Sequence, residues 1–76
     1  MKKFKPQKVK GWVARCSEDY YNDLYLFIYN PPTRMATYWF GGFAWDSMKL
    51  PKEMFPDLKW EDEPVPVEIT LTPVKE

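Results

Sequence analysis

Residues 24–29, Leu-Tyr-Leu-Phe-Ile-Tyr, are the stretch that decides the fold. Every position is aliphatic or aromatic, and successive side chains of a β-strand point to opposite faces of its sheet. The two leucines and Ile28 are therefore expected on one face, and the rings of Tyr25, Phe27 and Tyr29 on the other. A small sheet normally leaves one face to water. Either the rest of the chain covers the aromatic face, or three rings about 7 Å apart form an exposed platform.

Two further segments are predicted to be strands of the same sheet. Residues 9–16, Val-Lys-Gly-Trp-Val-Ala-Arg-Cys, precede the first stretch by one hairpin loop, so the two should pair antiparallel. Alternation places Trp12, Ala14 and Cys16 on one face, and we expect Trp12 in the core. Residues 65–72 alternate apolar and polar side chains, and this last strand should pair with the first one near an edge of the sheet.

The segments between these strands give weaker signals. Residues 38–45 favour an aromatic hairpin that turns at Gly41-Gly42, or else one strand with a glycine bulge. Residues 51–56 favour a short helical turn, because Pro51 suits a first turn and Pro56 blocks its extension. A helical turn after Ser17 is also compatible with the sequence.

The sequence therefore predicts an all-β fold. It is expected to be a small antiparallel meander of four to five strands, forming a curved sheet or open barrel, with one short helical turn near 51–56. A two-layer roll is the alternative. Residues 9–76 form the single domain, and residues 1–8 form a flexible basic tail.

Composition restricts how such a domain is stabilised and what it carries. A core of 76 residues rarely supplies more than about 3–5 kcal/mol without a disulfide or a metal. Cys16 is the only cysteine and histidine is absent, so the dense aromatic residues are expected to take that role. Residues 1–16 carry six bases and no acid (+6), and the remainder carries five bases and eleven acids (−6). Lysines on a first strand indicate either a nucleic-acid contact or the protection of an exposed edge.

Catalytic and metal chemistry find little support in the sequence. Without histidine, most acid–base and triad schemes lose their usual base. Cys16 is expected to be a small buried hydrophobe, and the acidic run 61–63 a solvated loop without ion-binding spacing. We expect a protein that is not an enzyme and that has no cofactor and no metal. A lone cysteine, no apolar signal segment and no membrane-length apolar run favour a cytoplasmic location without membrane contact.

Two kinds of binding function stay open. The first is a small interaction module that binds a protein partner or a second copy through an exposed aromatic surface; the candidate residues are Tyr20, Tyr21, Tyr25, Phe27 and Tyr29. The alternative is single-stranded nucleic-acid binding, in which bases stack on that strand face and a basic arm follows the phosphates. The residues of this basic arm are Lys2, Lys3, Lys5, Lys8 and Lys10.

A set of short motifs resembles a group of small proteins common in gut Bacteroidetes genomes and their phages, a group with no assigned activity. The motifs span about residues 12–71: Trp12-Val13-Ala14-Arg15, Leu24-Tyr25-Leu26-Phe27, Pro32-Thr33-Arg34, Trp39, Leu50-Pro51, Met54-Phe55-Pro56 and Trp60-Glu61-Asp62-Glu63-Pro64. In that group the first hairpin loop is usually a short Asp/Gly turn, whereas residues 17–23 are longer here. The resemblance implies a structural accessory protein of a phage or mobile element as a third possibility.

Overall fold

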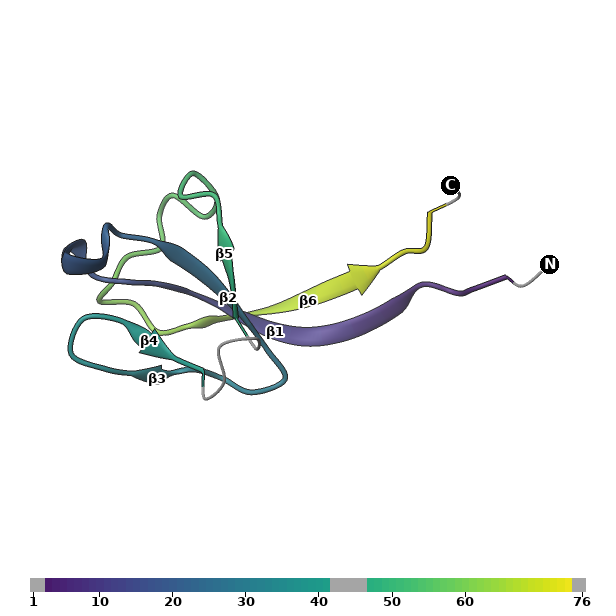
Figure 1. The fold of residues 1–76 in the computed structure, drawn as a ribbon, viewed down its shortest axis with the longest axis horizontal. Coiled ribbons are helices and arrows are strands. Elements are labelled where there is room, and N and C mark those ends of the chain that lie inside the picture. The colour runs from purple at the N-terminus through teal and green to yellow at the C-terminus, as the bar shows by residue number, and fades with distance from the viewer. Residues whose placement is uncertain (1–2, 42–46, 75–76) are drawn as a thin grey trace.

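A computed structural model describes residues 3–41 and 47–74, and it is all-β (Figure 1). A four-stranded antiparallel sheet has the order β5-β2-β1-β6, and a separate two-stranded sheet pairs β3 with β4. The strands are β1 Gln7–Arg15, β2 Leu24–Ile28, β3 Thr33–Arg34, β4 Trp39–Phe40, β5 Ser47–Leu50 and β6 Val65–Leu71. The predicted all-β antiparallel fold is confirmed, and the larger sheet is open, with β5 and β6 at its edges.

The central pair is the predicted one. β1 and β2 are antiparallel, with Trp12 opposite Phe27 and Val13 opposite Leu26. β6 pairs with the other side of β1, from Gln7 opposite Leu71 onward. β1 therefore lies between β2 and β6 only over residues 11–13, and it already begins within the predicted tail. Lys8 and Lys10 lie where β1 has a strand on one side only, which agrees with the exposed edge that is one of the two interpretations of these lysines.

Part of β1 extends beyond β2. The ladder with β2 covers only residues 11–15, so residues 7–10 of β1 pair with residues 68–71 of β6 alone. We call this two-stranded ribbon the arm. Figure 1 shows it extending away from the other strands toward the end of the molecule where both termini lie. The molecule is accordingly elongated, with extents of 50 × 24 × 18 Å.

The helical turn predicted near 51–56 is wrong. The segment forms two turns, closed by hydrogen bonds from Met54 N–H to the Pro51 carbonyl and from Leu58 N–H to the Phe55 carbonyl. Carbonyls in this segment accept hydrogen bonds from Arg15 instead of following a helical path. Among the described residues the only helix is η1, a 3-10 turn at Glu18–Tyr20 that follows Ser17.

The aromatic segment near residue 40 pairs differently from the prediction. β4 pairs with β3, the strand that precedes it in the sequence, and Met35 N–H donates to the Tyr38 carbonyl across the turn. The predicted turn at Gly41-Gly42 and its second aromatic run lie outside the described residues. Gly41 itself lies against Phe27, because a Cβ added there would be 2.6 Å from the Phe27 ring.

The core is divided between the two faces of the larger sheet. On one side, the aromatic face, the buried residues are Ala14, Cys16 and Phe27 from the sheet, with Trp39 packed on them from β4. On the other side, the aliphatic face, Val13 and Leu24 pack against Leu58 from the turns after β5. The alternation predicted for residues 24–28 is confirmed. Trp12 is only half-buried, because β4 covers the neighbouring end of this face. The prediction that Trp12 lies in the core is therefore wrong.

Candidate interaction surface

The predicted aromatic surface does not assemble. Phe27 is 3% exposed beneath Trp39, and Tyr25 is half-buried beside it, with 6.4 Å between the Tyr25 and Phe27 ring centroids. Tyr29 is 70% exposed, but it lies past the end of β2 in a left-handed backbone conformation (φ 75°). β4 and Trp60 thus cover the centre of the predicted platform and make it core.

The two remaining tyrosines of that surface lie around η1. Tyr20 packs on Tyr38, with 5.2 Å between the ring centroids. Tyr21 is exposed, and the Lys52 ammonium lies 5.9 Å from its ring centroid. Neither ring forms an aromatic pair with Tyr25 or Phe27 among the described residues, so no single aromatic surface joins the five candidates in the described chain.

The predicted basic arm, which is the set of five N-terminal lysines and not the two-stranded arm defined above, is partly neutralised. Lys8 pairs with Glu68 at 3.5 Å, and the Lys10 ammonium lies 5.2 Å above the ring of Trp12. Lys3 and Lys5 are exposed before β1, and Lys2 lies outside the described residues. A row of free lysines beside three open rings, which single-strand binding needs, is therefore not present in the described chain.

A different surface stands out, on the opposite side of the sheet. Residues directly opposite one another in a ladder share a face, and the register places one row of aliphatic side chains across all four strands: Met48, Leu26, Val13 and Val65. Neighbouring rows continue it with Ile28 and Val67, and with Val9 and Ile69 on the arm. At the strand positions of this face, Gln7 and Arg15 are the only polar residues.

The aliphatic face is covered at one end only. Leu58 packs over Val13 and Leu24, which are buried. On the edge strand β5 and along the arm, the described residues leave the face partly open, since Met48 is 55% and Leu71 58% exposed. The half-buried members between these two are Val9, Leu26, Ile28, Val67 and Ile69.

The two ends of this face differ in charge. Beside Val65 lies a hollow of about 390 Å³ with apolar walls from Phe55 and Leu58 and an acidic rim; the rim residues are Asp57, Asp62 and Glu63. The free end of the arm, where Phe4, Lys5 and Leu71 lie, is called the arm tip. A second hollow, of about 450 Å³, lies among these three residues. One end of the face is therefore acidic and the other basic.

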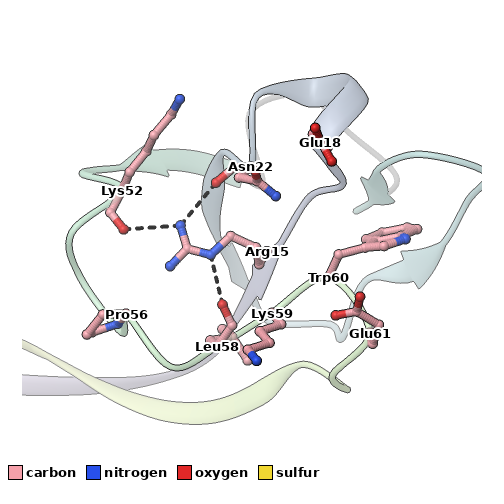
Figure 2. A pocket seen from close by; sticks show the side chains of 9 residues that line it. All are labelled: Arg15, Glu18, Asn22, Lys52, Pro56, Leu58, Lys59, Trp60 and Glu61. Carbon is pink, nitrogen blue, oxygen red and sulfur yellow. Dashed lines mark hydrogen bonds between the residues drawn. The ribbon is translucent and has the colours of Figure 1, made fainter.

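The turns that carry the acidic end are held by Arg15 (Figure 2). Its side chain is buried at the end of β1, and all its nitrogens donate to backbone carbonyls. The acceptors are the carbonyl oxygens of Asn22, Lys52, Met54, Phe55 and Leu58, at 2.9–3.1 Å. The pocket beside Arg15, about 500 Å³, is lined by both bases and acids. Because these bonds engage the whole guanidinium, it is not free for an anionic ligand.

Arg34 holds the next loop in a similar way. Its guanidinium carbon lies 4.4 Å from the ring centroid of Trp39 and 4.5 Å from that of Trp60. It also donates to the carbonyls of residues 60–62. The arginines of the Trp-Val-Ala-Arg and Pro-Thr-Arg motifs thus each hold one of the later motifs in place.

Two buried ionisable groups near Arg15, the Asp23 carboxylate and the Cys16 thiol, have surroundings that indicate a structural role and not a catalytic one. The Asp23 carboxylate is buried and lies 3.4 Å from the Lys49 ammonium and 3.7 Å from that of Lys52. Cys16 is buried as predicted, and its burial raises the pKa of the thiol, with a smaller upward contribution from the charge of Asp23. A thiol that stays protonated is a poor nucleophile.

Within residues 3–41 and 47–74, no group of three or more His, Cys, Asp or Glu side chains is placed to hold a metal ion. No helix in the described part of the chain has the length and apolar character that crossing a membrane requires. A comparison of the sequence and the fold with protein families, curated proteins and solved structures finds no match.

Proposed function

We propose that this protein is a small protein-binding module whose contact surface is the aliphatic face of its sheet. The observation that carries the proposal is the partial exposure of this face at two places, Met48 on the edge strand β5 and Leu71 at the end of the arm, which are each more than half exposed. The aromatic face, where the sequence predicts the contact, is covered by β4. A contiguous apolar surface of this kind is typical of protein interaction sites.

The arm makes the asymmetry between the two faces clear. On the aliphatic side it presents Val9 and Ile69, and on the other side Lys8, Thr70 and Glu68. The polar side is suited to water and already pairs Lys8 with Glu68. The apolar side is suited to a protein surface, because burying aliphatic area releases about 25 cal/mol per Å².

A site-specific photo-crosslinker tests the proposal. We would place it at Leu71, on the aliphatic face, and separately at Thr70, on the opposite face of the same strand. Crosslinks to protein, in purified protein or in extracts of the source cells, are expected from position 71 and not from position 70. Equal labelling from both positions, or none from 71, would overturn the proposal.

A salt-dependent oligonucleotide titration separates this function from the nucleic-acid alternative. Binding through lysines weakens steeply with salt because counterions are released. We expect the NMR signals of Val9 and Leu71 to stay unmoved by a mixed single-stranded oligonucleotide at low salt. Shifts at Lys8, Lys10 and Tyr25 that vanish at high salt would favour the alternative.

A further inference from the structure

We infer that the partner of the aliphatic face is a second copy of this chain, packed face to face and antiparallel so that the arm tip of each copy lies over the acidic hollow of the other. This inference rests on the proposed function and names the occupant of the same surface. Three observations lead to it: the charge at the two ends of the face, their spacing, and the area that a stable dimer needs.

The charges are complementary only in the antiparallel arrangement. The hollow beside Val65 has an acidic rim, whereas Lys3 and Lys5 are exposed at the arm tip. A parallel stack would place acid over acid and base over base. A two-fold axis across the face brings each basic tip to an acidic hollow, and it makes this contact twice, because such an interface uses the same patch on both copies.

The spacing suits a two-fold axis near the middle of β6. The acidic end begins at Val65 and the basic end lies at Leu71, so by the strand rise the two ends are about 20 Å apart. An axis midway between them passes close to Val67 and Ile69, which both lie on the aliphatic face. Apolar side chains then meet at the centre, with the charged contacts at the rim, as in typical interfaces.

The area that a stable dimer must bury explains why the interface has to include both ends of the aliphatic face. Four strands span about 15–20 Å in width and the arm is only two strands wide, so the strands alone present at most about 300–400 Å² in projection. A stable interface buries about 800 Å² on each partner. The contacts of Phe4, Lys5 and Leu71 with the hollow at Phe55 extend the interface along the molecule, so the antiparallel overlap makes the fullest use of the face.

Charge reversal at the two ends gives the test. Wild type and four variants would be followed by analytical ultracentrifugation over a concentration series. The single variants Lys5→Glu and Glu63→Lys should each raise the dimer dissociation constant about tenfold or more, because like charges then meet at both rims. The double variant Lys5→Glu/Glu63→Lys, and an equimolar mixture of the two single variants, should both recover dimers. The matched control is Glu18→Lys, which makes the same charge change as Glu63→Lys but on η1, and it should leave the dissociation constant unchanged.

The outcomes separate this inference from the proposed function. A wild-type chain that stays monomeric while position 71 crosslinks to another protein overturns the second copy as partner and leaves the binding surface standing. Single variants that dimerise like wild type, or a mixture that does not recover, overturn the antiparallel arrangement. A control that weakens the dimer equally would mean that net charge, and not pairing of the ends, governs assembly, and this also overturns it. Urea unfolding of each variant confirms that the monomers remain folded.

Discussion

The Nε of Arg15 donates a hydrogen bond to the Leu58 carbonyl at 2.9 Å, joining the end of β1 to a turn 43 residues later in the chain. The same guanidinium bonds four further carbonyls. Five fixed donors on a planar group can satisfy carbonyls that point in different directions. The turns at 51–58, and with them the cover over Val13 and Leu24, therefore depend on one side chain.

Arg15→Lys should accordingly be strongly destabilising despite its conserved charge. An ammonium on a flexible stem cannot reach five separated carbonyls, and a buried acceptor without a partner costs about 1–3 kcal/mol. We expect a loss of at least about 2 kcal/mol, measured by urea unfolding. The matched control is Lys59→Met beside the same pocket, which should change stability by less than about 0.5 kcal/mol. Equal effects for the two variants would show that Arg15 does not hold the turns.

Two of the tryptophans at the aromatic face, Trp39 and Trp12, should differ in their contribution to stability. Trp39 is buried, packs edge-on against Trp60 with 5.8 Å between the ring centroids, and donates from Nε1 to the Arg15 carbonyl. Trp39→Ala should cost about 3–5 kcal/mol, the range for a large buried aromatic side chain. Trp12→Ala should cost clearly less, since Trp12 is half-buried. Chemical denaturation of both variants checks the order, and a larger loss for Trp12→Ala would contradict the packing described.

The strand alternation was predictable because it is local. Side chains of residues 24–28 alternate between the faces regardless of what covers them, and a single hairpin loop before Leu24 favours antiparallel pairing with β1. β5 was missed because Ser47-Met48-Lys49-Leu50 is short and mixed in character. Its strand conformation comes from pairing with β2, which the local sequence does not encode.

The choice of face was not predictable, because it depends on contacts far apart in the chain. Both faces of β2 are apolar, and the alternation does not say which one Trp39 covers. The helical turn predicted near 51–56 does not form for the same reason, because Arg15, which is distant in the sequence, binds carbonyls of this segment. The candidate interaction surface is therefore the aliphatic face, on the opposite side of β2 from Phe27.

Two glycines test how tightly each face is packed. A Cβ at Gly41 would meet the buried Phe27 ring at 2.6 Å and 3.0 Å, and a ring held in the core cannot move away. A Cβ at Gly11 would meet the end of Ile69 at 2.8 Å, which is flexible, and the Phe27 carbonyl at 3.0 Å. We expect Gly41→Ala to cost about 2–3 kcal/mol and Gly11→Ala about 1 kcal/mol, within the range for overpacking.

The double variant Gly11→Ala/Ile69→Val is the check on this assignment. It removes the Ile69 Cδ1 that the new methyl would meet, so the two changes should couple and restore part of the loss. Urea unfolding of the two single variants and the double variant gives the coupling energy. Strict additivity would mean that Ile69 does not cover Gly11, and the aliphatic face would then have to be redrawn.

Cys16 should be unreactive in the folded protein, and its stability contribution should depend on pH. Burial raises the pKa of the thiol, so the folded state holds its proton more tightly than the unfolded state. As the pH rises past the ordinary thiol pKa of about 8.5, the unfolded chain ionises first and unfolding becomes easier. We expect slow alkylation by iodoacetamide that becomes fast in urea. Between neutral pH and mildly alkaline pH, the free energy of unfolding of the wild type should fall more steeply than that of Cys16→Ala. Parallel slopes for the two proteins would mean that the thiol titrates alike in both states, and fast alkylation of the folded chain would place Cys16 at the surface.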